Sequence, residues 1–124
     1  MIYTTYFAKL RVLPENIVPI SICAKASSWY KGLQYKTLAP KYDFFMEWKK
    51  THDNNMYIKC FKEQVTDNLN ANLVVNDLKQ MVQEKYGEDK DIALVCYEKS
   101  EDFCHRHLVA KWLKENGYDV EEWI

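Results

Sequence analysis

The amino-acid sequence predicts a single α/β domain of three layers, a mainly parallel sheet flanked by helices. One observation is the run Ile-Ala-Leu-Val-Cys-Tyr at 92–97, which is apolar throughout and bounded by charges, as in a strand covered on both faces. Another is the return from a helical pattern at 105–116 to a strand pattern at 120–124, which favours a parallel sheet packed by helices. With 124 residues, 48% of them apolar and 28% charged, residues 1–124 can bury one core without disulfides or metals.

Two strands are predicted near the start of the chain. Residues 2–7 are β-branched and aromatic, and residues 17–23 repeat that pattern, with Pro19 typical of an edge or of a strand beginning. The segment 8–16 is short for a helical crossover. Either the two strands do not pair in the usual way or the crossover is a single tight turn. Residues 24–40 follow as a long loop with one helical turn, and long loops in compact domains are often functional.

Three helices are predicted before the strand at 92–97. The first runs over 43–52 with Asp43 as a candidate N-terminal cap. Apolar spacing predicts a second helix over 57–65 and a third over 74–86. Gly87 then ends the third helix as a left-handed cap.

The charge balance gives no global preference for nucleic acid or for an acidic membrane, because the net charge is −1. The first third nevertheless has a basic excess that could form a local patch, made by Lys9, Arg11, Lys25, Lys31, Lys36 and Lys41. No secretory signal and no apolar run near the roughly 18 residues of a membrane helix are visible, so a cytoplasmic protein without a membrane partner is expected. The four cysteines, at 23, 60, 96 and 104, are then expected to be reduced thiols.

The junction between the strand at 92–97 and the helix at 105–116 is the best candidate for chemistry. Ligands of open parallel sheets lie outside the carboxyl ends of the strands. Those ends should lie near Phe7, Cys23 and Tyr97, with Glu98 and Lys99 just beyond. A helix N-terminus at the same edge offers backbone N–H groups and a positive dipole end. Cys104 would lie there as a nucleophile, and Arg106 could hold an anionic group beside it.

Helical geometry separates the two histidines of this junction. At about 100° per residue, His105 points toward the sheet and His107 toward solvent, so His105 is the candidate acid/base residue. The same geometry predicts that Cys96, Cys104, His105 and His107 diverge, whereas zinc needs convergent ligands. We therefore expect no metal and no cofactor.

Structural roles for the same residues remain open. Cys104 could be a small loop-end residue and His105 a satisfied core histidine, while Arg106 could pair with an acidic residue at 98, 101 or 102. Cys96, on a buried strand, is expected to be a core thiol. Trp29, which lies near Lys25, could stack a base or ring, or could belong to a lid on the sheet.

The residues Ala93-Leu-Val-Cys-Tyr-Glu-Lys and Glu101-Asp-Phe-Cys-His-Arg-His resemble a bacterial family of uncharacterised proteins, domain of unknown function 488. The hallmark of that family is a strand ending Cys-x-Glu-Lys, a short acidic loop and Cys-His-Arg at the start of a helix. The matching positions are Cys96, Glu98, Lys99, Cys104, His105 and Arg106. Ile2-Tyr3-Thr4 and Leu38-Ala39-Pro40 also resemble the family.

The chain departs from the family pattern at two places. Typical members have Gly-His where this chain has Tyr6-Phe7, and many have Asp-x-Arg where it has Ser21-Ile22-Cys23. The resemblance adds weight to a functional site at 104–106, and the departures allow a binding-only branch.

Three functions follow from these observations. The first is an enzyme that uses Cys104 or His105 on a phosphate-bearing or nucleotide-like substrate held by Arg106 and Lys99. The second is a non-catalytic module that binds a nucleotide or nucleic acid through the basic first third and Trp29. The third is a small interaction domain in which the Cys-His-Arg unit is scaffolding. The sequence leaves the oligomeric state open.

Overall fold

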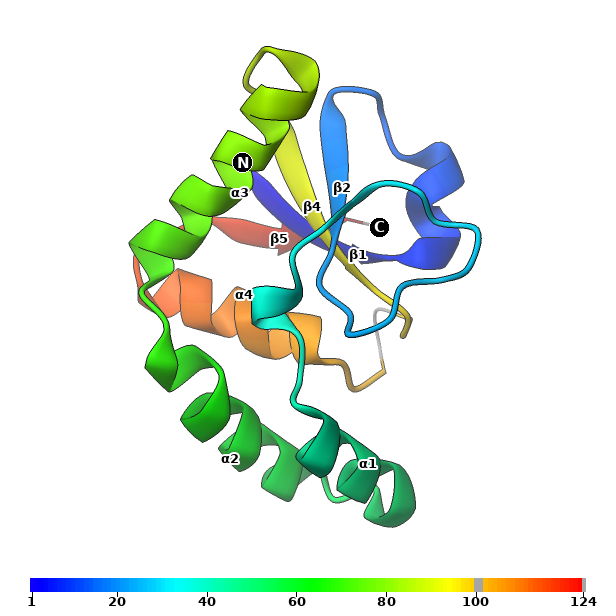
Figure 1. Cartoon of the computed structure of the whole chain (residues 1–124), viewed down its shortest axis with the longest axis vertical. Coiled ribbons are helices and arrows are strands. Elements are labelled where there is room, and N and C mark those ends of the chain that lie inside the picture. The colour runs from blue at the N-terminus through cyan, green and yellow to red at the C-terminus, as the bar shows by residue number, and fades with distance from the viewer. Residues whose placement is uncertain (100–101, 124) are drawn as a thin grey trace.

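The sheet is parallel throughout and has five strands in the order β3-β2-β4-β1-β5 (Figure 1). The structure, a computed structural model, describes residues 1–99 and 102–123. The strands are β1 (Ile2–Tyr6), β2 (Ile17–Ser21), β3 (Leu33–Gln34), β4 (Asp91–Cys96) and β5 (Val120–Glu122). The predicted α/β class with a parallel sheet is thereby confirmed.

In the described parts of the chain, four α-helices lie in the order in which the sequence predicts them. They are α1 (Tyr42–Thr51), α2 (Asn54–Gln64), α3 (Ala71–Tyr86) and α4 (His105–Glu115), with short 3-10 helices η1 (Phe7–Val12), η2 (Lys36–Leu38) and η3 (Thr66–Asn68). None of the helices in the described parts of the chain is long and apolar enough to span a bilayer.

The helix ends follow from local capping chemistry. The side chains of Asp53 and Asn70 accept hydrogen bonds from backbone N–H groups in the first turns of α2 and α3. Gly87 ends α3 with a φ of 72°, which confirms the predicted left-handed cap. The predicted cap at Asp43 is wrong, because α1 begins one residue earlier and Asp43 lies in its first turn. An acidic group there still suits the helix dipole.

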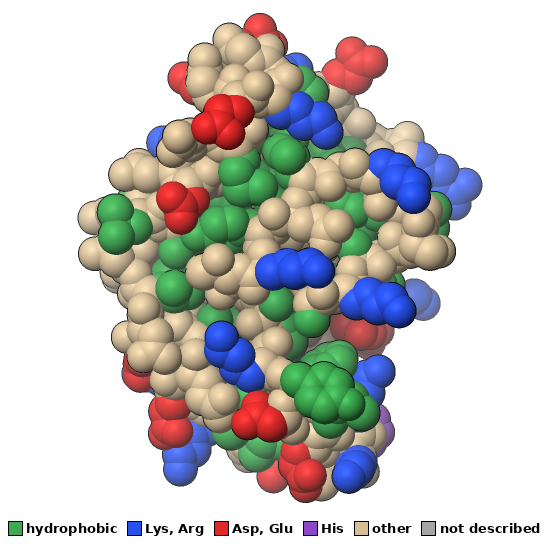
Figure 2. Space-filling model, viewed as in Figure 1, with side chains coloured by type: hydrophobic (Ala, Val, Ile, Leu, Met, Phe, Trp, Pro, Cys, Tyr) green, Lys and Arg blue, Asp and Glu red, His purple; other side chains and the backbone are tan. Residues whose placement is uncertain are grey.

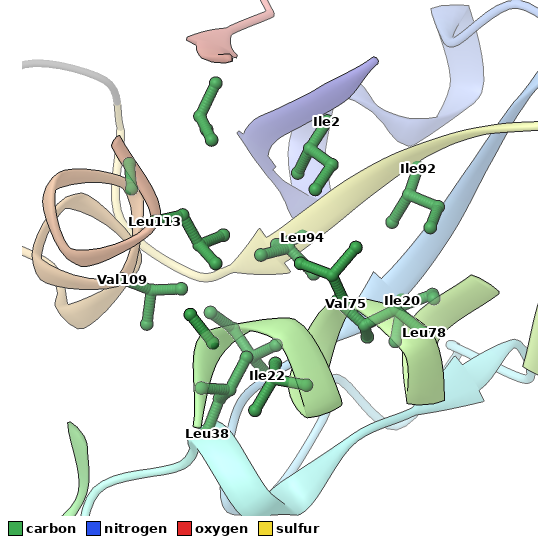
Figure 3. Close-up of a cluster of buried hydrophobic side chains, with 14 of the residues drawn as sticks. Ile2, Ile20, Ile22, Leu38, Val75, Leu78, Ile92, Leu94, Val109 and Leu113 are labelled. Carbon is green, nitrogen blue, oxygen red and sulfur yellow. The ribbon is translucent and has the colours of Figure 1, made fainter. Parts of the chain in front are cut away.

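All four α-helices contribute to one hydrophobic cluster on one face of the sheet. The strand register places Ile2, Val18, Ile92 and Val120 side by side, so their side chains share that face. Figure 3 shows side chains of α3 and α4 directed toward Ile92 and Leu94.

The opposite face is covered by η1 and by the loop between β2 and β3. Phe7 and Tyr30 pack there with Val95 of β4. The Tyr30 hydroxyl donates a hydrogen bond to the carbonyl oxygen of Leu33 at 2.6 Å, which fastens the loop to β3. The third layer is therefore a 3-10 helix with a loop, and this explains why β4 is apolar at successive positions.

The chain order explains why the two faces differ. From β1 to β3 the chain moves toward one edge of the sheet, and from β3 through β4 to β5 it moves toward the other. Because parallel crossovers are right-handed, connections that run in opposite directions lie on opposite faces. The strands β1 and β2 do not pair with each other, since β4 lies between them and η1 makes the crossover. The loops after β2 and β4 consequently leave the sheet on opposite sides, which opens a crevice between them.

Candidate functional site

A cavity of about 540 Å³ opens at the carboxyl ends of β2 and β4. Its floor comes from three places in the chain: Cys23 to Lys25 after β2, Cys96 to Glu98 at the end of β4, and Cys104 with His105 at the start of α4. The Tyr97 hydroxyl donates a hydrogen bond to the Lys25 carbonyl oxygen at 2.7 Å, so the loops after β2 and β4 are tied together. The cavity therefore lies where the topology reverses, as ligand sites of open α/β sheets do.

The wall of the cavity is aromatic. Phe45 and Trp48 come from α1, Tyr57 from α2, and Phe103 from the residues just before α4. The Phe103 ring lies 5.6 Å from the Trp48 ring and 5.1 Å from the Tyr57 ring, centroid to centroid. Contacting rings hold one another in place, so the wall presents fixed aromatic surface. Lys49 adds a cationic side chain to this wall.

Two sulfur atoms and an imidazole nitrogen meet at the floor. The Sγ atoms of Cys96 and Cys104 are joined as a disulfide. Nδ1 of His105 lies 3.4 Å from Cys96 Sγ and 3.9 Å from Cys104 Sγ. The sequence positions explain the meeting, because Cys96 is the last residue of β4 and Cys104 is the N-cap of α4. We call these three residues the sulfur–imidazole cluster.

One hydrogen bond fixes the orientation of His105. Nε2 lies 2.8 Å from the carbonyl oxygen of Ile22, and a carbonyl can only accept, so Nε2 carries the proton. The Ile22 backbone is itself held by a hydrogen bond from its N–H to the Val95 carbonyl oxygen. In this tautomer the Nδ1 lone pair faces the sulfur atoms. Burial lowers the pKa of His105 to about 4, with the Arg106 and His107 charges acting in the same direction, so the ring is neutral near neutral pH.

Arg106 lies on the other side of α4, away from the cavity. Its side chain is fully buried, and its Nε and Nη2 donate to the two carboxylate oxygens of Glu122 at 3.2 and 2.8 Å. Thr4 Oγ1 donates to the same carboxylate, and the guanidinium lies 5.7 Å from the Tyr6 ring centroid. Arg106 does not line the cavity, so the structure does not bring it together with the predicted catalytic pair.

Among the residues predicted to bind a ligand, Cys23, Lys25 and Glu98 line the cavity. Cys23 is buried, its Sγ lies 3.8 Å from the Val95 carbonyl oxygen, and burial raises the pKa of its thiol to about 11. Lys99 is exposed and is not among the lining residues. Trp29 is not among the lining residues either, and it packs edge-on against Phe7 at 5.9 Å between ring centroids.

Two expectations about the cysteines are wrong. Cys96 and Cys104 form a disulfide, although all four cysteines are predicted to be reduced thiols. The ligand atoms of Cys96, Cys104 and His105 all lie within 4.8 Å of one another, although the sequence predicts that they diverge. The N-cap of α4 lies at the end of β4, which helical geometry alone does not reveal. Cys23 and Cys60 are free.

The sequence reasoning missed the aromatic wall. The spacing of Phe45 and Trp48 places them on one face of a helix, and that signal is present in the sequence. An apolar helix face predicts burial, but the pattern is the same whether the face packs in the core or lines a cavity. Phe103 lies in a polar segment that carries no periodic signal.

Comparison with known proteins identifies one family. The model of the subclade DUF488-N3a, described as the active DUF488-N3 subclade, matches residues 8–117. No curated protein and no solved structure matches the chain. The match covers both strands that form the cavity floor, the helices of its wall and the Cys-His-Arg segment. The chain therefore belongs to the domain of unknown function 488 family.

Proposed function

We propose that this protein is a cysteine-dependent enzyme that acts on a planar, phosphate-bearing substrate such as a nucleotide. The observation that carries the proposal is the position of Cys104 at the floor of an aromatic cavity, beside the Nδ1 atom of His105. Family membership supports an uncharacterised protein, and the chemical role is our inference from the geometry.

The nucleophile in this proposal is Cys104 in its reduced state. As the N-cap of α4, its sulfur lies at the positive end of an 11-residue helix, which favours a thiolate. The thiol loses its proton to solvent, the thiolate forms a bond to an electrophilic atom of the substrate, and the leaving group departs with a proton from solvent; water then displaces the group bound to sulfur and restores the thiol. Since burial makes His105 a weak base, we expect it mainly to orient the S–H group by accepting its hydrogen bond.

The cavity wall supports the substrate class. Trp48 and Phe45 offer aromatic surface on which a base or another planar ring can stack. Lys25 and Lys49 line the same cavity and can pair with phosphate. In this proposal Lys25 keeps the binding role that the sequence predicts for it, and Phe45, Trp48 and Lys49 replace Arg106, Lys99 and Trp29.

The test is a ligand-protection experiment on the reduced full-length protein. Alkylation of each cysteine is followed by mass spectrometry, with and without a panel of nucleotides. We expect Cys104 to react at least tenfold faster than the partly buried Cys60, and we expect a nucleotide to slow the labelling of Cys104 alone. A Cys104 that reacts no faster than Cys60, together with no protection by any nucleotide, would overturn the proposal.

A second candidate is a non-catalytic module that binds a nucleotide or a nucleic acid. It is favoured by the exposed basic residues of the first third, Arg11, Lys25, Lys31, Lys36 and Lys41. Figure 2 shows Lys and Arg side chains set apart from one another across the displayed face. This candidate predicts binding that weakens steeply with salt and that survives Cys104→Ser unchanged. Binding that is insensitive to salt would argue against it.

A further inference from the structure

The sulfur–imidazole cluster has the composition of a metal site. Its three donor atoms, two sulfurs and one imidazole nitrogen, lie within 4.8 Å of one another, and all three residues are buried. Thiolate sulfur and neutral imidazole nitrogen are the donors that Zn²⁺ prefers in proteins. A disulfide uses up both sulfur atoms, so only the reduced protein can offer this donor set.

The surroundings of His105 match those of a metal-binding histidine. Such residues almost always donate their second ring N–H to a carbonyl or carboxylate group, which fixes the tautomer and aims the other nitrogen at the metal. In this structure Nε2 donates to the Ile22 carbonyl oxygen at 2.8 Å, and Nδ1 is directed at both sulfur atoms. This orientation is set by the fold, because Ile22 is anchored to β4.

The position of the cluster indicates which type of metal site it would be. Structural zinc sites usually have four protein ligands, whereas catalytic sites keep one position for water or substrate. The cluster supplies three ligands and forms part of the floor of the 540 Å³ cavity. A fourth position would therefore face the cavity, where a small molecule could reach it.

We propose that the reduced protein binds one Zn²⁺ ion through Cys96 Sγ, Cys104 Sγ and His105 Nδ1, with the fourth coordination position open to the cavity. Reduction of the disulfide by an external thiol or phosphine supplies two electrons and leaves two thiols. Metal binding then releases their two protons to solvent. The site requires neither that Cys104 attack a substrate nor that a nucleotide bind.

The experiment uses the full-length protein in two redox states. One sample is reduced with a phosphine and freed of metal with a chelator, and the other is oxidised to the Cys96–Cys104 disulfide. Each is titrated anaerobically with Zn²⁺ against a chromophoric competitor, and separately with Co²⁺. We expect one equivalent of Zn²⁺ to bind the reduced sample and none to bind the oxidised one. The cobalt form should show thiolate-to-metal charge-transfer absorption.

Variants assign the ligands. Cys96→Ser, Cys104→Ser and His105→Gln should each weaken Zn²⁺ binding by more than the roughly 10–100-fold that loss of an outer-shell partner causes. Cys60→Ser is the matched control and should bind as the parent does, because Cys60 lies outside the cluster. A Cys23→Ser variant with unchanged affinity supports the open fourth position, and a marked loss would contradict it.

If a variant fails to fold, Zn²⁺ binding by the oxidised and reduced samples of the unmutated protein still tests the inference. Equal Zn²⁺ binding by the oxidised and reduced samples, or none by the reduced sample, would overturn it. Alkylation of metal-free reduced protein tests the proposed enzyme separately. A reactive Cys104 without metal uptake would refute the zinc site alone.

Discussion

Two neighbouring residues at the start of α4 belong to regions with opposite character. His105 faces the carboxyl ends of β2 and β4, where its Nδ1 lone pair meets two sulfur atoms at the floor of a cavity. Arg106 faces β1 and β5, where the Glu122 carboxylate accepts two hydrogen bonds from its guanidinium group. Arg106 does not line the cavity. The Cys-His-Arg segment is therefore divided into a part that lines the cavity and a part whose interactions remain within the fold.

This difference shows that proximity in a motif does not imply a common role. Arg106 has no exposed surface, and a buried guanidinium needs a partner at all times. The sulfur–imidazole cluster instead keeps donor atoms whose chemistry depends on its redox state. We expect substitutions in the ion pair to affect mainly stability and substitutions in the cluster to affect mainly reactivity.

The largest effect is expected from removal of the ion pair. Glu122→Ala leaves the Arg106 charge buried with its main partner lost, which should lower the free energy of unfolding by about 3–5 kcal/mol. Urea denaturation followed by circular dichroism measures this change. Lys62→Ala is the matched control, because its ion pair with Asp67 lies at the surface and should contribute nothing measurable.

The double variant Arg106→Met/Glu122→Leu sharpens this prediction. Replacing a buried ion pair with apolar side chains often costs little, so most of the lost stability should return. Thiol reactivity at Cys104 should be that of the parent. If the reactivity falls in the double variant while stability recovers, the separation of the two regions is wrong.

The second effect concerns the pH dependence of stability. His105 has a folded pKa of about 4, below the value of 6.5 expected for the unfolded chain, so the unfolded state binds more protons between these values. The neutral ring therefore contributes stability that is present above pH 6.5 and is lost as the pH falls toward 4. The loss should be on the order of 3 kcal/mol relative to His105→Gln. If the free energy of unfolding depends on pH in the same way in the parent and in His105→Gln, the His105 ring is not held neutral by the fold.

The third effect tests the wall of the cavity. Trp48→Phe should weaken nucleotide binding by less than the roughly 1–3 kcal/mol that removal of a whole stacking ring costs, because the stacking surface is reduced and not lost. It should also remove the quenching of tryptophan fluorescence that a bound nucleotide causes. Trp29→Phe is the control outside the cavity lining and should change neither quantity. If quenching is lost in Trp29→Phe and kept in Trp48→Phe, the nucleotide binds at the loop between β2 and β3 and not in the cavity.

The smallest effect is expected from the lysines at the rim. Lys25→Ala and Lys49→Ala should each weaken nucleotide binding by up to about fivefold, the range of an exposed charge pair. Titrations at several salt concentrations should show a reduced salt dependence in both variants. Lys99→Ala, a change at an exposed residue that does not line the cavity, should bind as the parent does.

Much of the fold could be predicted because it depends on local pattern. The apolar run of β4, the glycine that ends α3 and the order of the helices all follow from periodicity and backbone preference. The edge of the sheet at which the cavity opens is also the edge that the sequence indicates, since parallel sheets bind ligands at the carboxyl ends of their strands, and the roles of the residues there stay predictions. The inward position of His105 followed from helical geometry and is confirmed, with 5% of its surface exposed.

The rest depends on contacts between residues that are distant in the sequence. The partner of Arg106 could not be predicted, because Glu122 approaches only after β5 pairs with β1. The disulfide could not be predicted either, because it requires the path of the loop between Cys96 and Cys104. The aromatic wall depends on how α1 and α2 lie against Phe103, which the periodicity of a single helix does not determine.

The central claim is that the sulfur atoms of β4 and α4 meet beside His105. Disulfide mapping tests it most directly: the reduced protein is treated with a mild thiol oxidant, its remaining thiols are alkylated, and its peptides are analysed without reduction. The structure predicts a Cys96–Cys104 linkage, with Cys23 and Cys60 alkylated. A linkage of Cys96 to Cys23, or alkylation of all four cysteines, would contradict the account.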